Sequence, residues 1–568
     1  MKMRVLGLGW VLTVVLLSGC SESREALQSR VQEQSVAAFG AQPNDDLNDL
    51  PALREALDAC RLASCRRLVI PPGTYILRDD EAVRLRDQVM RGEFGFNPER
   101  EMFRPYRPYV RGLDFTGIEE LVVEASGAEF LVEGWMEPIS LERCRDVTIR
   151  GLTIDYARPP FSLGRIQKVT ASYFDVEFEP RFPVNDGIPI PRVMLWDEGR
   201  DQMLGTCVYP DRLEMIGPQI LRLYGRCPEE AMGALALAGH SFHFRPAVFI
   251  HEAADIVLDE VAIHSQPGMG IVGHRAKDLL FRRLRITPRA GLPMSTNTDA
   301  THFTTCSGSI RFEDCQFEGH GDDATNIHNY YYTVAAEEGA RTYQLTVEAP
   351  TGTHAQVLDA PQVGETLELV ERRTLRAVES LETTAVELFP EEWRAVVKLD
   401  RPIEGELEDY FLINVSALPR VEIVGCQVRS HRARAFLIKT RDVLIEGNTI
   451  ENTTGTAIHV GAEGAWHEGP TAENIRIRRN RIVGCGTGEG TQNQASGIAV
   501  NVHAPDTTVP GLHQNILIEG NQIIGRDAAR GIFVSGAGNV TIRYNQVAGC
   551  SEAVVVEHSE QVAVYENR

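Results

Sequence analysis

Three aspartates near the middle of the chain have the spacing for acid–base chemistry. Asp322 and Asp323 are adjacent, and Asp299 precedes Asp322 by 23 residues. If the chain repeats with that period, the three carboxylates lie in one groove on neighbouring turns. Crowded like charges raise the pKa of at least one carboxyl, so an acid and a base lie side by side. Hydrolysis of a glycosidic bond requires this division of labour.

Two other interpretations of these acids are open. Asp and Asn are common in solvated turns, and clustered carboxylates also bind Ca²⁺. Histidines and aromatic residues around the acids favour catalysis over both. Lys439 and Trp466 are further candidates for the groove wall, although each residue type is more often a surface or packing residue.

A repeated phrase predicts the element that positions the aspartates. From about residue 420 onward, short runs alternate apolar and β-branched residues with polar ones, which predicts strands with one buried face. The phrases end in asparagines that are 32, 41, 24 and 22 residues apart. Strands so closely spaced leave no room for βαβ units and predict a solenoid of three short strands per coil. The closing residues are Asn448, Asn480, Asn521, Asn545 and Asn567.

Equivalent residues of successive coils stack at the strand spacing of about 4.8 Å. The closing asparagines are therefore expected to form an internal ladder. Cys315 and Cys426 occupy the same position in earlier phrases, which predicts buried structural thiols.

The fold predicted from this repeat is all-β, a right-handed parallel β-helix. A helical pattern over Asn48–Cys60 resembles the N-terminal cap of pectin-lyase-like β-helices. Two stretches of alternating strands break the coil rhythm and predict inserted small β-barrels or sandwiches. The expected order is cap and first coils over 21–156, an insertion over 157–247, catalytic coils over 248–331, a second insertion over 332–412, and final coils over 413–568.

The first twenty residues predict an export signal. Lys2 and Arg4 precede an apolar run that is too short to span a bilayer. The run ends in Leu-Ser-Gly-Cys20, which resembles a bacterial lipobox and implies lipidation of Cys20. Ser21, directly after the cysteine, resembles the residue that sorts lipoproteins to the outer membrane of Gram-negative bacteria. We expect a lipid-anchored protein of the Gram-negative cell envelope; a plain secretory signal is the alternative.

Composition limits the partners. A chain with 43% hydrophobic and 24% charged residues is typical of globular proteins. Its net charge of −22 repels nucleic acids and anionic polymers, so a neutral substrate is favoured. Among the eleven cysteines, Cys60 with Cys65 and Cys207 with Cys227 are candidate disulfides, and no cysteine or histidine cluster has zinc spacing.

Two known families resemble the acidic region. Polygalacturonases also place Asn-Thr-Asp one coil before Gly-Asp-Asp, but their downstream Gly-His-Gly is missing here, and Phe436-Leu-Ile-Lys439 only partly matches their Arg-Ile-Lys. The run Asn297-Thr-Asp-Ala-Thr-His-Phe303, with Gly319-His-Gly-Asp-Asp-Ala-Thr-Asn-Ile-His-Asn-Tyr330, more closely resembles the α-1,3-galactosidases of glycoside hydrolase family 110. That resemblance covers most of the chain. It implies an inverting exo-enzyme that removes terminal α-1,3-linked galactose, on a β-helix with inserted β-barrels.

The resemblance also implies roles for individual residues. Asp322 would be the general acid, while Asp299 and Asp323 activate water. Inversion requires an acid and a base about 6.5–9.5 Å apart, more than adjacent coils provide, so the side chains must diverge or the turn must widen there. No cofactor and no metal are expected, and activity should survive a chelator. Substrate contacts are expected from Asn297, His302, His320, Asn326, His328, Tyr330 and Lys439.

Two alternative functions remain at this stage. A pectin or carrageenan depolymerase would require a basic groove for its anionic chain, and a non-catalytic carbohydrate-binding surface protein would have no need of three stacked acids. The residues leave open whether linear, blood-group B or algal galactosides are preferred. They also leave open a homodimer through the edges of the insertions.

Overall fold

The computed structural model describes residues 33–63, 65–98, 109–347, 356–525 and 530–568. The predicted signal segment and Cys20 lie outside these residues. Within them, no helix combines the length and apolar character needed to cross a membrane. The helices are α2 (Leu50–Ala63) and α3 (Asp80–Met90), and the short 3₁₀ turns are η1 (Val36–Phe39), η2 (Glu229–Ala231), η3 (Gln356–Asp359), η4 (Pro390–Glu392), η5 (Leu407–Asp409) and η6 (Gly464–Trp466).

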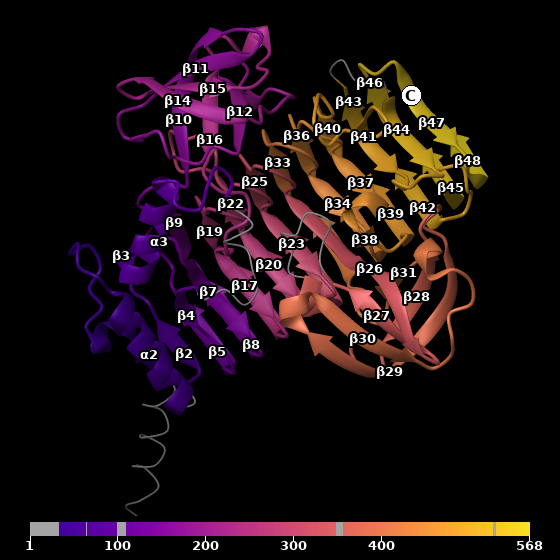
Figure 1. Cartoon of the computed structure of the whole chain (residues 1–568), viewed down its shortest axis with the longest axis horizontal. Helices are drawn as coiled ribbons and strands as arrows, with labels where there is room; N and C mark the ends of the chain where they lie inside the picture. The colour runs from indigo at the N-terminus through magenta and orange to yellow at the C-terminus, as the bar shows by residue number, and fades with distance from the viewer. Residues whose placement is uncertain (1–32, 64, 99–108, 348–355, 526–529) are drawn as a thin grey trace, which may run out of the picture.

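Three parallel sheets wind into one long coil (Figure 1), which confirms the predicted parallel β-helix. The first sheet contains β1 (Glu33–Ser35), β2 (Arg67–Val69), β5 (Glu119–Glu124), β8 (Arg145–Arg150), β18 (Ala254–Asp259), β21 (Lys277–Arg282), β24 (Ser307–Glu313), β32 (Arg420–Val424), β35 (Arg441–Glu446), β39 (Glu473–Arg478), β42 (His513–Glu519), β45 (Ala537–Arg543) and β48 (Glu560–Tyr565). The second contains β3 (Gly73–Arg78), β6 (Ala128–Glu133), β9 (Thr153–Tyr156), β19 (Ala262–Ile263), β22 (Arg285–Ile286), β25 (Gln316–Glu318), β33 (Gln427–Arg429), β36 (Thr449–Glu451), β40 (Arg481–Val483), β43 (Gln522–Ile524) and β46 (Gln546–Ala548).

The third sheet carries the site described below. Its strands are β4 (Arg111–Asp114), β7 (Glu137–Glu142), β17 (Val248–His251), β20 (Ile271–His274), β23 (Thr301–Thr304), β26 (Thr325–Gly339), β34 (Phe436–Ile438), β37 (Ile458–Val460), β41 (Ala495–Val500), β44 (Arg530–Ser535) and β47 (Glu552–Glu557).

The backbone conformation explains the polar residue near the start of the repeated phrases. Asp442, Asn474, Asn515 and Asn539 have φ values of 62°, 59°, 60° and 52°. Asn and Asp tolerate this left-handed conformation better than other non-glycine residues. These four residues lie near the start of first-sheet strands, at positions that the strand pairing skips, so Asn or Asp is favoured there.

The predicted asparagine ladder is present. The backbone N–H and Nδ2 of Asn448 both donate to Oδ1 of Asn480, at 3.0 and 2.9 Å, and the same pair of bonds continues through Asn567. Cys426 extends the column, because its N–H donates to Asn448 Oδ1 at 2.8 Å. Cys315 and Cys426 are fully buried, as predicted for structural thiols.

The cap covers the open end of the first coils. Leu53, Ala56 and Leu57 on one face of α2 are buried in the core that runs along the helix interior. The Leu50 N–H donates to Asn48 Oδ1 at 3.2 Å at the start of α2. A solenoid exposes its hydrophobic interior at an end unless such an element covers it.

The first insertion is an antiparallel sheet between β9 and β17. Its strands are β10 (Phe161–Val169), β11 (Tyr173–Phe178), β12 (Arg192–Asp197), β13 (Gln202–Met203), β14 (Arg212–Gly217), β15 (Ile220–Tyr224) and β16 (Leu235–Gly239), in the spatial order β13-β12-β16-β10-β11-β15-β14. Separate hydrophobic clusters pack on its two faces. These strands lie within the predicted range 157–247.

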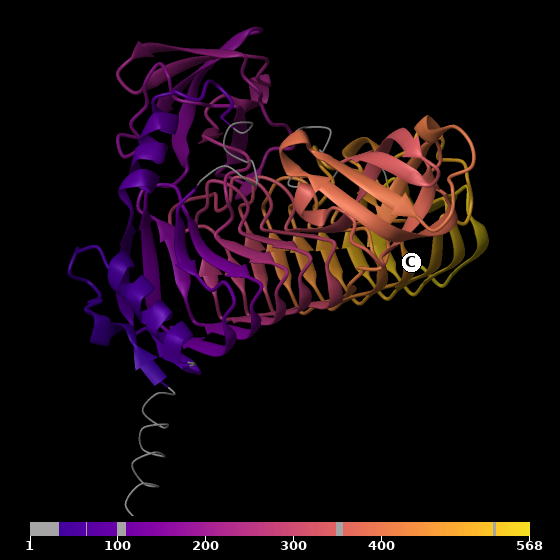
Figure 2. The same ribbon diagram turned by 60° about the horizontal axis from the view of Figure 1, so that its bottom comes forward.

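The second insertion is a closed barrel that begins inside the third sheet. β26 pairs in parallel with β23 and β34 and then continues outward to pair with β27 and β31. The added strands are β27 (Thr342–Thr346), β28 (Thr366–Glu371), β29 (Ala377–Phe389), β30 (Arg394–Leu399) and β31 (Tyr410–Asn414). Figure 2 shows both insertions on the same side of the coils, the second over the later ones.

One of the two candidate disulfides forms. Cys60 and Cys65 are bonded, whereas Cys207 and Cys227 are buried free thiols. The second pairing is therefore wrong. Cys207 and Cys227 belong to the clusters on opposite faces of the first insertion, so the sheet separates them.

Candidate active site

The helix brings the three aspartates together at one edge of the third sheet. Asp299 lies just before β23, and Asp322 and Asp323 lie just before β26. Those strands are parallel neighbours, with Thr301 opposite Thr325, so the turns before them stack. One carboxylate oxygen from each aspartate lies within 4.8 Å of the other two.

The carboxylates line a small pocket of about 160 Å³. That volume is below the roughly 300–1,000 Å³ of pockets for drug-sized ligands and suits a single sugar ring. Trp466 stands at its wall with 48% of its surface exposed. The remaining lining residues are His243, Met269, His302, Asn326, Arg432, Ala433, Arg434, Glu463, Glu468 and Gly490.

Two arginines from the next coil pair with the acids. Arg432 Nη1 lies 2.5 Å from Asp322 Oδ2, and Arg432 also pairs with Glu489 at 2.9 Å. Arg434 Nη2 lies 3.0 Å from Asp323 Oδ2, and its backbone N–H donates to Asp323 Oδ1 at 2.7 Å. Each arginine thus holds one aspartate in a fixed orientation.

Neither arginine was predicted as a site residue, although the sequence contains a regular spacing that points to them. Asp323 and Arg434 are 111 residues apart, and so are the stacked Cys315 and Cys426. The second insertion lies between both pairs. The strand pairing has the same offset, with Thr325 opposite Phe436, so Arg434 stacks on Asp323 in the next coil.

The protein environment separates the pKa values of the aspartates. Burial, together with the charge of Asp322, raises the pKa of Asp299 to about 8. Burial also raises the pKa of Asp323, against the opposing charge of Arg434. For Asp322, burial disfavours the charged form, but the charges of Arg432, Arg192 and Arg434 outweigh it and lower the pKa. Without substrate, Asp322 is therefore ionised near pH 7 and Asp299 is largely protonated.

A chain of hydrogen bonds continues behind Asp299. Asp299 Oδ2 lies 2.7 Å from His302 Nδ1, and His302 Nε2 lies 2.8 Å from His328 Nε2. His328 Nδ1 lies 3.2 Å from the Asn329 carbonyl oxygen. Burial lowers the pKa of His302 to about 4 and that of His328 to about 3, so both rings are neutral near pH 7.

This chain determines where the protons lie. The Asn329 carbonyl only accepts, so His328 Nδ1 carries a proton and His328 Nε2 is bare. His302 Nε2 must then donate to His328, which leaves His302 Nδ1 bare. The remaining bond requires Asp299 to be the donor. The histidines therefore stabilise protonated Asp299, in agreement with its raised pKa.

A buried lysine organises the opposite wall. Lys439 Nζ lies 2.6 Å from Glu468 Oε2, 2.9 Å from Glu463 Oε2 and 3.3 Å from Asn326 Oδ1. Asn326 Nδ2 donates to Glu468 Oε2 at 3.2 Å. Both glutamates line the pocket, and neither was predicted from the sequence.

The predicted substrate-binding residues fall into three groups. His302 and Asn326 line the pocket, while His328 and Lys439 lie one layer behind it. Asn297, His320 and Tyr330 are buried and do not line it, which corrects their assignment to direct substrate contact.

The three corrected residues support the site from within the protein. Asn297 Nδ2 donates to the Ser241 carbonyl at 2.8 Å and so joins the first insertion to the coil. His320 contacts Ser295 Oγ through Nδ1 at 3.0 Å. Tyr330 packs edge-on against His328 and belongs to the core of the second insertion.

The three aspartates also lie close enough together to hold a metal ion, and among the described residues they are the group that does so. Arg432 and Arg434 already pair with oxygens of Asp322 and Asp323. The protein itself therefore supplies the positive charge that a cation would bring to these carboxylates.

The chain is similar to a family model and to several known proteins. A family model described as right handed beta helix region matches residues 411–568. The chain is 25% identical over 482 residues to alpha-1,3-galactosidase B of Bacteroides thetaiotaomicron, covering 78% of this chain and 74% of that protein. It is 27% identical over 521 residues to alpha-1,3-galactosidase A of Bacteroides fragilis, covering 86% and 82%. Among solved structures, the A-module of a mannuronan C-5 epimerase from Azotobacter vinelandii aligns over 93% of this chain and 99% of the module, with 12% identity and a TM-score of 0.43.

Proposed function

We propose that this protein is a glycoside hydrolase. The observation that carries the proposal is the convergence of Asp299, Asp322 and Asp323 within 4.8 Å, in a pocket sized for one sugar. Their pKa values move in different directions, so a protonated and an ionised carboxyl coexist at neutral pH. Glycosidic hydrolysis uses such a pair as proton donor and base.

More specifically, the protein acts as an exo-α-1,3-galactosidase of glycoside hydrolase family 110, removing terminal galactose with inversion. Support comes from relatives of that name that align over most of the chain, and from the Asn-Thr-Asp and Gly-His-Gly-Asp-Asp runs. A small pocket suits attack at a chain end rather than within a polymer.

In this mechanism Asp322 protonates the glycosidic oxygen, and Asp299 with Asp323 activates water. Because Asp322 is ionised and paired with Arg432 without substrate, the sugar must separate the two before Asp322 takes up a proton. The reverse assignment, with Asp299 as acid and Asp322 as base, needs no such change. The two assignments differ in which aspartate matters less when the leaving group needs no protonation.

The geometry also constrains stereochemistry. Carboxylate oxygens within 4.8 Å of one another are closer than the roughly 6.5–9.5 Å of inverting enzymes. Inversion therefore requires the side chains to turn apart around the sugar and water. The first product anomer, observed by NMR before mutarotation, tests this: β-galactose indicates inversion and α-galactose retention.

The deciding experiment is incubation with α-1,3-galactobiose, polygalacturonate and carrageenan in parallel, with released sugar followed by NMR. Galactose released from galactobiose alone is the expected result. Shortened polymer chains would instead indicate a depolymerase. Absence of any product would indicate a non-catalytic binding protein.

We also propose that the mature chain is anchored in the cell envelope through a lipidated Cys20. The support is the Leu-Ser-Gly-Cys sequence after a short apolar run. Expression of the full chain with labelled palmitate should yield a labelled protein in the membrane fraction. The Cys20→Ser variant should carry no label, and a labelled variant would contradict the proposal.

A further inference from the structure

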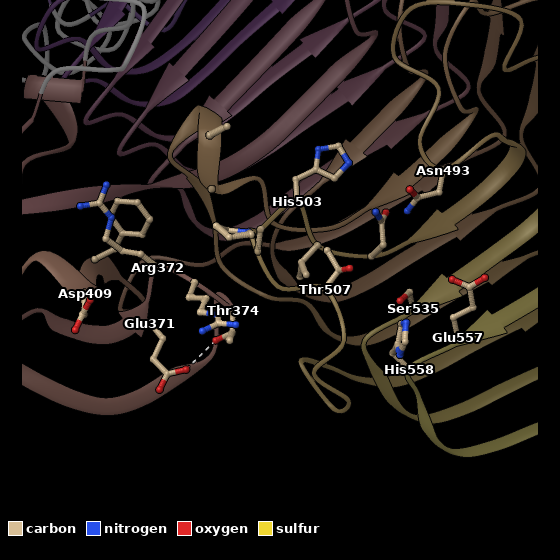
Figure 3. A pocket seen from close by; sticks show the side chains of 18 of the residues that line it. Glu371, Arg372, Thr374, Asp409, Asn493, His503, Thr507, Ser535, Glu557 and His558 are labelled. Carbon is tan, nitrogen blue, oxygen red and sulfur yellow. Dashed lines mark hydrogen bonds between the residues drawn. The ribbon is translucent and has the colours of Figure 1, made fainter.

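A second and much larger cavity, of about 1,090 Å³, lies beside the acidic pocket. We call it the barrel groove, because the second insertion forms one wall and the coils of β41, β44 and β47 form the other. Figure 3 shows Arg372 and Asp409 on the insertion side, facing Asn493, Glu557 and His558 from the coils. Its volume is sufficient for several sugar rings.

The barrel groove and the acidic pocket share a wall. Glu463 and Trp466 line the pocket, while Gly464 and Ala465 from the same turn line the groove. His503, in the groove, lies 3.4 Å from Glu463 Oε1 through its Nδ1, and its carbonyl accepts the Gly464 N–H at 2.9 Å. A chain leaving the pocket over this turn therefore enters the groove.

The groove surface has the character of a sugar-binding site. The Arg372 guanidinium lies over the Phe411 ring at 4.6 Å from its centroid, and that of Arg530 over Phe533 at 4.9 Å. Stacking holds each guanidinium flat. Arg372 Nη1 and Arg530 Nη1 donate to the backbone carbonyls of Glu408 and Asn493 at 3.2 and 3.3 Å, and the remaining N–H groups are held as donors for hydroxyl groups. Asn493 adds an amide with both donors and an acceptor.

The charges of the groove exclude a strongly anionic ligand. Three arginines and four carboxylates line it, so the cations are balanced by acids. Arg530 lies 3.7 Å from Glu557 at the groove wall and 3.6 Å from Glu552 outside it. A sulfated or uronate chain would meet carboxylates along its length and be repelled.

We propose that the barrel groove binds the leaving-group side of the substrate, an uncharged oligosaccharide that continues several sugars beyond the terminal galactose. This inference rests on the proposed function for its place in turnover. It assigns a substrate class, extended neutral glycans rather than disaccharides, to the same enzyme. The exposed Trp466, at the turn between the cavities, is positioned to stack against the first sugar beyond the scissile bond.

The test compares a double variant, which has one substitution in each wall of the groove, with a matched control. Asp409→Ala and Glu557→Ala together remove an exposed carboxylate from each side of the groove. Glu552→Ala is the control, because Glu552 lies on the same strand and pairs with the same Arg530 but does not line the groove. The substrates are α-1,3-galactobiose and a neutral tetrasaccharide with α-1,3-linked galactose at its non-reducing end.

The double variant should lower kcat/KM for the tetrasaccharide by about tenfold, since two hydrogen-bonding groups are lost, and leave that for galactobiose within about twofold. Glu552→Ala should change neither. Equal effects on both substrates, or no effect on the tetrasaccharide, would overturn the inference while leaving the proposed function intact.

A binding measurement separates the inference from turnover. The trisaccharide that lacks the terminal galactose should give saturation-transfer NMR signals with the wild-type protein, and weaker ones with the double variant. Absence of those signals would overturn the groove assignment. Their presence, without galactose release from any substrate, would support the groove and contradict the proposed galactosidase.

Discussion

Asp299 Oδ2 and His302 Nδ1 are 2.7 Å apart, and the hydrogen bonds behind His302 make Asp299 the donor of that contact. A neutral histidine that accepts this hydrogen bond stabilises the uncharged carboxyl of Asp299. Burial and the charge of Asp322 act in the same direction and bring the pKa of Asp299 to about 8. The proton on Asp299 therefore depends on the buried hydrogen-bonded chain of His302 and His328.

The first prediction concerns the pH dependence of turnover. The active enzyme carries one proton on the pair Asp299 and Asp322, so kcat/KM for galactobiose falls as pH rises through about 8, where Asp299 loses its proton, whichever of the two is the acid. A kcat/KM that keeps rising through pH 8 would contradict the raised pKa of Asp299. His302→Gln should move that limb to lower pH by about one unit, because the Gln amide can turn its NH₂ towards Asp299 and donate to the ionised carboxylate.

The same shift predicts a change in stability. A carboxyl with a raised folded-state pKa stabilises the fold below its unfolded value of about 3.9, and this stability is lost as pH rises through about 8. Asp299→Asn should therefore raise Tm relative to wild type more at pH 9 than at pH 5, by about 1 °C per kcal/mol in a chain of this size. Calorimetry at the two pH values measures the difference.

Asp322→Asn is the control for that experiment. Arg432 and the other arginines lower the pKa of Asp322, so its charge stabilises the fold above about pH 4. Its removal should lower Tm at neutral pH. The same direction of change for both variants would contradict the assigned pKa shifts.

Leaving-group dependence identifies the general acid. A nitrophenyl α-galactoside leaves without protonation, so loss of the acid matters little for it. Asp322→Asn should lower kcat/KM for galactobiose by about 10²–10⁴-fold and that for the nitrophenyl substrate far less. Asp299→Asn should impair both substrates. The reverse pattern would exchange the two roles.

The pair formed by Arg434 and Asp323 should contribute strongly to stability. Both side chains are largely buried, and Arg434→Met leaves the Asp323 carboxylate without its partner. We expect a loss of about 3 kcal/mol in the free energy of unfolding, part of which Asp323→Asn in the same chain restores. Urea unfolding measures both.

An exposed pair provides the comparison for Arg434. Arg429 lies 2.8 Å from Glu318 with 53% of its side chain exposed. Arg429→Gln should cost at most about 1 kcal/mol. A loss as large as that of Arg434→Met would show that burial does not distinguish the pairs.

Removal of metal ions should leave activity unchanged. Arg432 and Arg434 already neutralise Asp322 and Asp323, so a cation would have to displace ion pairs to reach their oxygens. Dialysis against EDTA followed by the galactobiose assay checks this. Activity that disappears and returns with added Ca²⁺ would show that the aspartates hold a metal.

The sequence by itself determined the coil and the identity of the acidic cluster. Period-two alternation, the asparagine at the end of each phrase and the one-coil spacing of Asp299 and Asp322 are local or regularly repeated, so they can be read without coordinates. In a solenoid, regular spacing in sequence becomes stacking in space. The ladder and the convergence of the aspartates follow directly.

Only the tertiary structure decided which side chains reach the pocket and how they are charged. β26 leaves the helix for the second insertion, so Tyr330 enters the core of that insertion instead of facing substrate. The insertion also hid Arg434, 111 residues from Asp323 in sequence but 3.0 Å away in space. Protonation depends on burial and on every nearby charge, which no repeat pattern specifies, and so the raised pKa of Asp299 became apparent only once Asp322 and the buried histidines were in place around it.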